Sequence, residues 1–411
     1  MADRIEQSYW QALQNRRLTL LIGGDMVSKV GDGMVIVALP LQTLRIHSDV
    51  NPALAVALIE AAPYVLAVAV SLAFGLGRRR FRPRALLTTD CVLRFTVLSG
   101  LALLAMAGQL PLWLLGAALF AGSGLRLLAA SSRRLVATGM AGIEGRFAVN
   151  GLLGTSDSLT AYVIGPVLGG ILATAVSPGF VMLLDGLSFA GLLVVVLVAV
   201  PPGTSETVRG PRGSASGWTI LRRIPIAAWL FAVVFLFNLF YMPIEVALPL
   251  LVRGPLHASG AALGGIWTGF GVGALVGALA TNHLRRLPQT ALLVAIIAGW
   301  GCCVGVLAAA PNIGVAVGAF AIGGLIYAPF TPVAYSLVQS RLDADQQQPV
   351  LTLWAAGSAV ASPIGLLLGG PLIQLTGTRT GILVSALLTL ALVPAAGHAL
   401  RRAGRAGVML G

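Results

Sequence analysis

The stretch LTLLIGGDMVSKVGDGMVIVALPLQTL, from Leu18 to Leu44, decides the fold because it is a long apolar run that carries three ionisable residues. A helix of about 20 apolar residues crosses a lipid bilayer, and this run is longer than that. Asp25, Lys29 and Asp32 lie in its interior. Each ionisable side chain at bilayer depth costs roughly 2.5 to 3.5 kcal/mol, so such residues normally face a cavity or a charged partner. We therefore predict a membrane-spanning helix that turns a charged stripe toward the inside of a helix bundle.

Similar apolar runs recur along the rest of the chain. Hydrophobic residues make up 57% of the chain and charged residues 10%, and the mean hydropathy is +0.90, a composition that excludes a soluble globule. The runs are also too long and too continuously apolar for the alternating strands of a membrane barrel. We therefore predict an all-α membrane protein with twelve transmembrane helices. The expected spans are about 18–44, 52–76, 85–108, 110–131, 148–175, 179–200, 226–252, 260–282, 290–309, 312–338, 350–375 and 380–400.

The net charge of +13 raises the question of a nucleic-acid partner, and the placement of the basic residues argues against one. Of the 27 Lys and Arg residues, 21 fall in the two terminal segments and in every second loop, whereas the intervening loops hold only Arg45, Arg253 and Arg379. This bias marks the cytoplasmic side of a membrane protein. We predict a multi-pass protein with both termini in the cytoplasm. The high Ala, Gly and Arg content and the near absence of Lys indicate a bacterial source, and hence the bacterial cytoplasmic (inner) membrane.

Two sequence echoes indicate that the chain consists of two related halves. The pentapeptide VALPL occurs at Val37–Leu41 and again at Val246–Leu250, and an Arg-Arg pair followed by Ala-Leu-Leu occurs near residues 79–87 and 285–293. Both offsets are close to half the chain, which predicts two pseudo-symmetric six-helix bundles around a central path. The predicted segments are a cytoplasmic N-terminal segment (1–17), an N-terminal bundle (18–200), a cytoplasmic linker rich in Pro, Gly, Ser and Thr (201–225), a C-terminal bundle (226–400) and a cytoplasmic tail (401–411).

The three ionisable residues of the first span form the leading candidate site. Asp25, Lys29 and Asp32 are spaced i, i+4 and i+7, so they lie on one stripe of a helix. A carboxylate, an ammonium and a second carboxylate in this order can take up and release a proton as water or substrate enters. Asp32 lies near the middle of the span and is the leading proton or cation site. The alternative is a static charge cluster that only locks the helices together.

Other ionisable residues are secondary candidates. Four are expected at membrane depth, namely Glu60, Asp157, Glu245 and Arg126. Each of the acids can instead form a structural pair or lie at headgroup level, and the arginine can either anchor its helix at the interface or pair with the acids. Asp90 and Arg94 are spaced i, i+4, and for them we predict a local structural ion pair.

The segment YVIGPVLGG, Tyr162 to Gly170, combines close-packing residues with a helix-breaking one. Gly165, Gly169 and Gly170 let another helix approach closely, and Pro166 is expected to kink the span. Generic small-residue packing is the simpler explanation of this pattern. If it is a functional motif, we expect it to control how closely the two halves pack during the transport cycle.

No residue pattern indicates an enzyme. The four His residues are scattered over loops and helix ends, and no nucleotide-binding Gly-rich loop with its Lys follows a strand. Cys91, Cys302 and Cys303 form no metal-binding spacing and are expected to be small core residues. We predict neither catalysis nor a cofactor nor a metal, and an ion gradient remains as the energy source.

The chain resembles the major facilitator superfamily over nearly its whole length, and four stretches carry the resemblance. Within the superfamily it resembles the drug:proton antiporter branch, which includes macrolide-efflux and siderophore-exporter-like proteins. The four stretches are GDG followed by VALPL (Gly31–Leu41), the D-x-x-x-R of Asp90 and Arg94, YVIGPVLGG, and the D-x-x-S-F of Asp185–Phe189. The resemblance implies a twelve-helix transporter driven by protons, and the YVIGPVLGG stretch is associated in that family with export.

One loop departs from the family pattern. In that family the loop between the second and third helices usually reads like GxLADRxGRR, with an acid that helps to latch the outward-open state. Here Ser71–Arg80 reads SLAFGLGRRR, with Gly75 at the place of the acid, and the equivalent Gly277–Arg286 has Thr281 there. We therefore expect conformational switching to rely on other contacts.

The sequence thus predicts a monomeric secondary transporter in the lipid bilayer that exports a small amphipathic organic molecule in exchange for protons. The molecule would resemble a drug, an antibiotic or a siderophore. One alternative is a proton symporter that takes up a nutrient. The other is a transporter-shaped receptor that no longer transports, although the cost of burying several acids argues against it.

Overall fold

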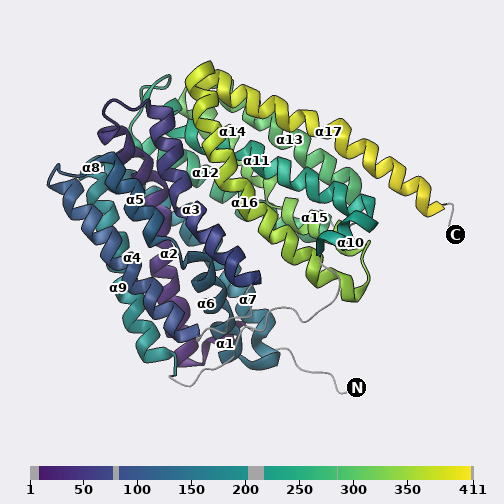
Figure 1. The fold of residues 1–411 in the computed structure, drawn as a ribbon, viewed down its shortest axis with the longest axis horizontal. Coiled ribbons are helices and arrows are strands. Elements are labelled where there is room, and N and C mark those ends of the chain that lie inside the picture. The colour runs from purple at the N-terminus through teal and green to yellow at the C-terminus, as the bar shows by residue number, and fades with distance from the viewer. Residues whose placement is uncertain (1–8, 77–82, 202–216, 285, 409–411) are drawn as a thin grey trace. The chain divides into compact units, whose positions relative to one another are not determined.

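The computed structural model describes residues 9–76, 83–201, 217–284 and 286–408, and all regular secondary structure in these ranges is helical. One short π-helical turn, η1, interrupts an otherwise α-helical run. The helices are α1 (Tyr9–Leu13), α2 (Arg16–Ile46), α3 (Pro52–Leu76), α4 (Pro83–Met106), α5 (Leu112–Gly122), α6 (Arg126–Met140), α7 (Gly142–Leu159), η1 (Thr160–Ile164), α8 (Gly165–Ala175), α9 (Pro178–Ala199), α10 (Gly217–Arg223), α11 (Pro225–Arg253), α12 (Gly260–Leu284), α13 (Gln289–Ala309), α14 (Ile313–Tyr327), α15 (Phe330–Gln339), α16 (Ala344–Thr376) and α17 (Thr378–Val408) (Figure 1).

Eleven of the described helical segments are long and apolar enough to cross a membrane. The expected first span, 18–44, lies within the continuous helix α2, which is not among the eleven. Asp25, Lys29 and Asp32 place three charged residues in the interior of α2. The prediction of an all-α membrane protein with many spans is confirmed.

Several helix ends follow directly from the local sequence. The Asn15 side chain accepts hydrogen bonds from the main-chain N–H groups of Arg17 and Leu18 and so caps α2. Ser177 caps α9 in the same way, and Pro178 follows it at the first helical position, where no N–H is needed. The prolines of the two VALPL repeats lie inside α2 and α11, since long membrane helices tolerate them.

The ends of the predicted cytoplasmic segments differ from the helix boundaries in two places. Helix α10 forms within the expected linker 201–225, whose residues 202–216 lie outside the described part. Helix α17 continues to Val408 and therefore enters the expected tail 401–411. The basic part of the SLAFGLGRRR loop, residues 77–80, also lies outside the described residues.

The chain packs into two compact units. The first comprises Met1–Ser48, Ala62–Gly210 and Leu263–Gly265, and the second comprises Asp49–Ala61, Pro211–Ala262 and Ile266–Gly411. The residues of α3 therefore divide between the two units.

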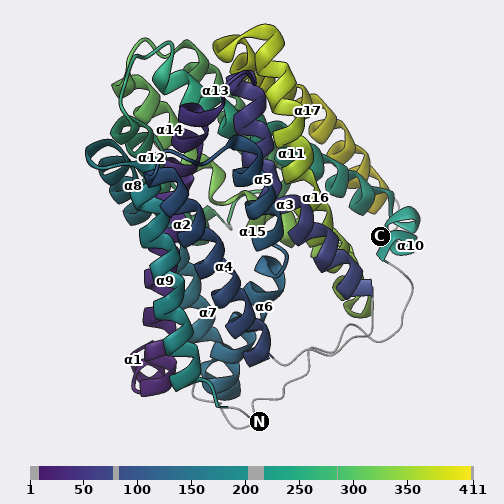
Figure 2. The same cartoon turned by 60° about the vertical axis from the view of Figure 1, so that its left-hand side comes forward.

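In the first unit, α9 is the central packing element. It packs along α2 and α4, and the three helices lie side by side in both ribbon views (Figure 2). Helix α8 packs on α2, and α6 packs on α4. This arrangement surrounds the charged stripe of α2 with other helices.

In the second unit, α11 packs on α16 and α17, and α13 packs on α17 and α14. Its interior holds a cluster of stacked aromatic rings. The rings of Phe237 and Phe330 have centroids 4.1 Å apart, and Tyr241 stacks on Trp300 at 5.3 Å. Offset and edge contacts of this kind stabilise a core beyond the apolar area that they bury.

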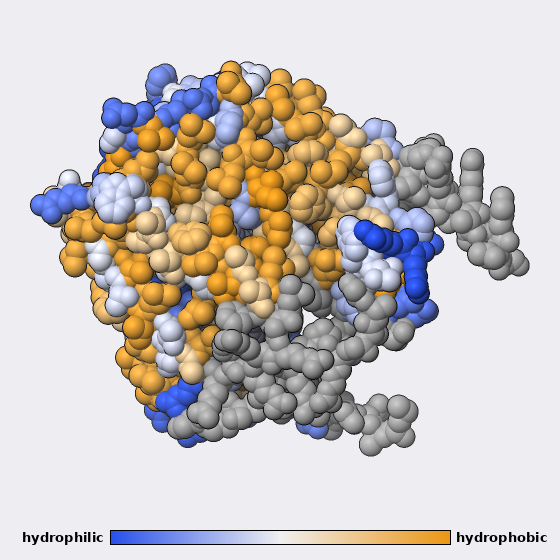
Figure 3. Space-filling model, viewed as in Figure 1, coloured by the Kyte–Doolittle hydropathy of each residue, from blue (hydrophilic) through white to orange (hydrophobic). Residues whose placement is uncertain are grey.

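Hydrophobic residues cover most of the face seen in the space-filling view, and hydrophilic residues gather at its margins (Figure 3). Large apolar side chains such as Trp113, Leu279 and Leu375 are largely exposed in the protein. A soluble protein rarely exposes so much apolar surface, whereas lipid tails cover it without cost. The exposed surface therefore agrees with a protein embedded in a bilayer.

Candidate functional site

The charged stripe of α2 meets a different helix of the first unit at each of its three residues. Asp32 accepts a hydrogen bond from Nη1 of Arg94 on α4 at 3.1 Å. Asp25 pairs with Arg133 on α6, and Lys29 pairs with Asp157 on α7. The i, i+4, i+7 spacing thus places three ion pairs along one helix, each joining α2 to a neighbour.

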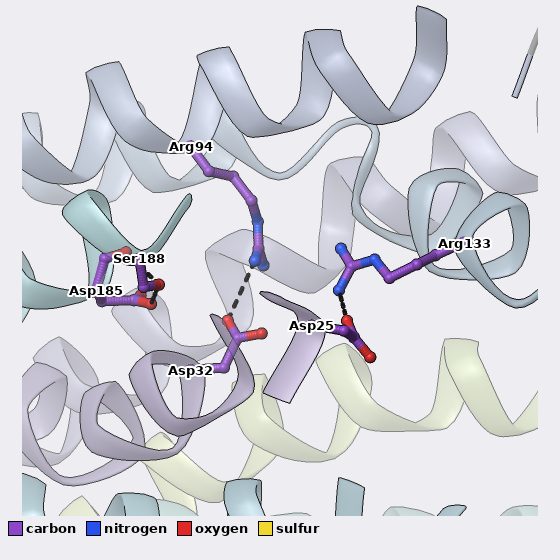
Figure 4. A network of polar contacts seen from close by, with 6 residues as sticks. All are labelled: Asp25, Asp32, Arg94, Arg133, Asp185 and Ser188. Carbon is purple, nitrogen blue, oxygen red and sulfur yellow. Dashed lines mark hydrogen bonds and ion pairs between the residues drawn. The ribbon is translucent and has the colours of Figure 1, made fainter. Parts of the chain in front are cut away.

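The Asp32–Arg94 pair is the most distinctive of the three. The Arg94 side chain is 12% exposed and that of Asp32 is 30% exposed, so the pair is shielded but accessible from one side. The guanidinium group also lies 4.3 Å from the centre of the Phe189 ring on α9, a distance typical of a cation–π contact. Figure 4 shows Arg94 reaching from α4 toward Asp32, with Asp185 and Ser188 to one side (Figure 4).

Asp185 adds a further carboxyl group to this region. It belongs to the D-x-x-S-F stretch, lies on α9 and is 1% exposed. The Ser188 hydroxyl donates to the main-chain oxygen of Asp185 at 2.7 Å and lies 3.3 Å from its Oδ1. The sequence marked this stretch only as a family-like motif, and the structure places it beside Arg94.

The Asp25–Arg133 pair is more deeply buried. The Asp25 side chain is 3% exposed and that of Arg133 is 11% exposed. Removing one partner of such a pair leaves an uncompensated buried charge, so the pair ties α2 firmly to α6. Sequence reasoning missed Arg133 because it assigned this residue to a cytoplasmic loop. The available signal was its position on the buried stripe of α6 with Ala129, Val136 and Ala137.

The Lys29–Asp157 pair is the most exposed of the three. Asp157 lies two residues before the end of α7, and the π-helical turn η1 follows α7 directly. Turns of this kind often occur at functional positions in helices. The pair therefore links the charged stripe of α2 to the one irregular turn of that membrane span.

The predicted Asp90–Arg94 ion pair is not formed. Arg94 binds Asp32 instead, and Oδ1 of Asp90 is buried without a hydrogen-bond partner in the described structure. The spacing allowed the local pair, but tertiary packing brings a second carboxylate to the same guanidinium. Arg126, expected to be either an anchor or a partner for the acids, lies with its guanidinium carbon 5.6 Å from the centre of the Tyr64 ring.

Glu60 and Glu245 belong to the second unit, whereas the charged stripe of α2 belongs to the first. The Tyr241 hydroxyl donates a hydrogen bond to Glu245. Oε2 of Glu60 is buried without a hydrogen-bond partner among the described residues, and Glu245 lies within electrostatic range of it. The structure therefore separates the predicted acids into two groups.

The glycines of YVIGPVLGG bring α8 against α2 within the first unit. A Cβ added at Gly165 would come within 2.6 Å of the Cα atom of Gly33, and one at Gly169 would collide with the main chain of Met34. Pro166 and Gly170 are also buried, and the helix irregularity lies in η1, immediately before Gly165. The predicted close helix approach is present, and it occurs next to Asp32.

The described residues contain no group of three or more His, Cys, Asp and Glu side chains that could hold a metal ion.

Comparison with known proteins identifies the family. The sequence pattern of the Major Facilitator Superfamily matches residues 21–348. The chain belongs to the Major Facilitator Superfamily. It is 25% identical over 385 residues to the multidrug efflux pump Tap of Mycobacterium tuberculosis (strain ATCC 25618 / H37Rv), with 90% of each chain covered.

Several solved transporter structures share the fold of this superfamily member. A bacterial homologue of the iron transporter ferroportin in the inward-facing state matches with a TM-score of 0.72 at 15% identity, covering 93% of this chain and 98% of the other. A point mutant of the nucleoside transporter NupG matches with a TM-score of 0.70 at 11% identity, covering 94% and 99%. At these identities the likeness shows the fold alone. Family and fold confirm the prediction of a membrane transporter rather than an enzyme.

Proposed function

We propose that this transporter exports a small amphipathic organic molecule, such as a drug, an antibiotic or a siderophore-like compound, in exchange for protons. The observation that carries the proposal is the Asp32–Arg94 ion pair inside the helix bundle, 3.1 Å long and beside the buried Asp185. Ionisable groups at this depth are expensive and are usually kept for ion or substrate pathways. The 25% identity to a multidrug efflux pump supports export over uptake.

In this proposal Asp32 is the coupling residue. When Asp32 is ionised, Arg94 holds it and ties α2 to α4. Protonation removes the charge that Arg94 binds, so the helices become free to shift. Asp25 and Lys29 tune the site through their own pairs, and the Gly165–Gly170 segment sets how closely α8 follows α2. The alternating-access cycle would be driven by this change.

Glu60, Asp157 and Glu245 are the secondary coupling candidates in this proposal, and Arg126 is a secondary cation. The protein would act as a monomer in the bacterial cytoplasmic membrane with both termini in the cytoplasm. The support for this orientation is the placement of the basic residues in every second loop. The proton gradient supplies the energy, without a cofactor.

The first test is efflux of a panel of hydrophobic dyes and antibiotics from pump-deficient bacteria that express the chain. Wild type, Asp32→Asn and the exposed loop control Asp49→Asn are compared at matched expression, with and without a protonophore. We expect wild type and the control to export the compounds, and we expect the protonophore to stop this export. We expect no export by Asp32→Asn. Export that survives Asp32→Asn would move the coupling to another acid, and net uptake would favour a symporter.

A further inference from the structure

Arg94 lies among more carboxyl groups than it binds. It donates to Asp32 at 3.1 Å, and its charge also interacts with Asp90 and Asp185. Arg94 has a planar guanidinium group with several donors in a fixed fork, so it can exchange one carboxylate for another by a small rotation. One guanidinium group cannot neutralise three carboxylates, so at most one further acid can share Arg94 with Asp32.

The surroundings of Asp185 favour its uncharged form. It is 1% exposed, and the described residues provide it with no ion pair. The Ser188 hydroxyl has a single hydrogen, which the main-chain oxygen of Asp185 accepts at 2.7 Å. The same hydroxyl lies 3.3 Å from Asp185 Oδ1, to which it can donate only a weak, shared hydrogen bond. An ionised carboxylate buried without a cation would cost several kcal/mol.

The surroundings keep Asp185 close to the Asp32–Arg94 pair. Helix α2 has no side chain at Gly31, directly before Asp32, and a Cβ there would collide with Oδ1 of Asp185. The Arg94 guanidinium already lies over the ring of Phe189, one turn along α9 from Asp185. The close-up view shows the Arg94 guanidinium group above Asp32, with Asp185 and Ser188 on the same left-hand side (Figure 4).

We propose that Asp185 is the alternative partner of Arg94 and carries the second exchangeable proton of the coupling site. When Asp32 takes up a proton, it loses its charge and releases the guanidinium group. Arg94 then moves to Asp185, whose carboxyl group gives up its proton to water. One proton is bound and one is released, Arg94 stays charged throughout, and the net charge of the three side chains is the same before and after.

The charged groups that act electrostatically on Asp185 come from three helices. They are Asp32 on α2, Arg94 on α4 and Arg126 on α6. Arg126 lies over the Tyr64 ring and stays a fixed background charge in the exchange. The proposal rests on the proposed function only in that the proton taken up by Asp32 comes from the gradient.

Infrared difference spectroscopy of the full-length protein in lipid nanodiscs tests this exchange without requiring transport. A protonated carboxyl group has a C=O band that an ionised one lacks. We expect a band in wild type that is lost completely in Asp185→Asn, which assigns it. Asp32→Asn imitates a protonated Asp32, so we expect it to release Arg94 and to abolish the same band. The exposed control Asp49→Asn is expected to keep it.

Two results would overturn the proposal. A spectrum unchanged by Asp185→Asn would mean that Asp185 is ionised in wild type, and a band that persists in Asp32→Asn would mean that Arg94 does not transfer. If Asp185→Asn does not fold, Ser188→Ala replaces it. Loss of the hydroxyl that contacts the Asp185 carboxyl group must shift the band. An unshifted band would reject the assignment of the band to Asp185. If the infrared spectra are as expected but the protein shows no proton-coupled flux, the proposed function is refuted and the Arg94 exchange still stands.

Discussion

Arg94 on α4 binds Asp32 on α2, and leaves Asp90, the acid one turn before it on its own helix, without an ion pair. The local i, i+4 partner contributes little to holding two helices together, whereas the α2–α4 pair spans the interface between them. The pair is also shielded, which strengthens it relative to one in water. This relationship makes several substitutions informative.

Loss of Arg94 should destabilise the protein more than loss of both partners. Arg94→Met leaves the Asp32 carboxylate without its cation, and we expect a cost on the order of 2 to 3 kcal/mol, since Asp32 is only partly buried. The double variant Arg94→Met/Asp32→Asn removes both charges and should recover at least half of that loss. Thermal unfolding in detergent measures both. Equal destabilisation by the single and double variants would show that the unpaired Asp32 carboxylate is not the cause of the loss in Arg94→Met.

Asp90→Asn should be neutral or stabilising. Asp90 is 2% exposed, and its Oδ1 has no hydrogen-bond partner in the described structure, so the change removes a poorly compensated acid. We expect a stability change of less than about 1 kcal/mol, together with normal efflux. A loss as large as that of Arg94→Met would mean that Asp90 pairs with Arg94 in a state that dominates in solution.

Gly165→Ala should damage the α8–α2 contact. Its Cβ would come within 2.6 Å of the Cα atom of Gly33, so the two backbones must separate, at a cost of about 1 to 3 kcal/mol. Gly154→Ala is the matched control, because nothing lies within 4 Å of a Cβ at that helical position. The control should be as stable as wild type or up to about 1 kcal/mol more stable. Similar melting temperatures for the two variants would contradict the packing described here.

Glu60→Gln should leave proton coupling intact. Oε2 of Glu60 is buried without a partner among the described residues, and Glu245 lies within electrostatic range, so the change replaces a poorly compensated buried acid of the second unit with a neutral amide. We expect melting at the wild-type temperature or above, and efflux that still stops when a protonophore is added. Efflux that becomes insensitive to the protonophore would place the coupling acid in the second unit.

The sequence was sufficient for the membrane helices and for the charged stripe of α2. Long apolar runs leave few alternatives to transmembrane helices, and the helical period alone places Asp25, Lys29 and Asp32 on one face. The close approach of the Gly165 segment also follows from the small residues of the motif. These features depend on local patterns, which the sequence carries directly.

The partners of the stripe could not be predicted, because they depend on how neighbouring helices are rotated. Arg133 counted as a loop residue, yet α6 continues to Met140 and turns it inward. The spacing of Asp90 and Arg94 favours a local pair, but helix packing places Asp32 against the same guanidinium group. No local sequence pattern predicted the π-helical turn at Thr160–Ile164.

The most direct test of the central claim is proton movement driven by substrate in liposomes that contain the purified protein. A substrate found in the efflux panel is imposed as a gradient, and the internal pH is followed with a trapped dye. We predict substrate-driven proton flux for wild type, and for Asp32→Asn a loss of that flux by at least about tenfold with substrate counterflow retained. Undiminished proton flux in Asp32→Asn would contradict the assignment of coupling to the Asp32–Arg94 pair.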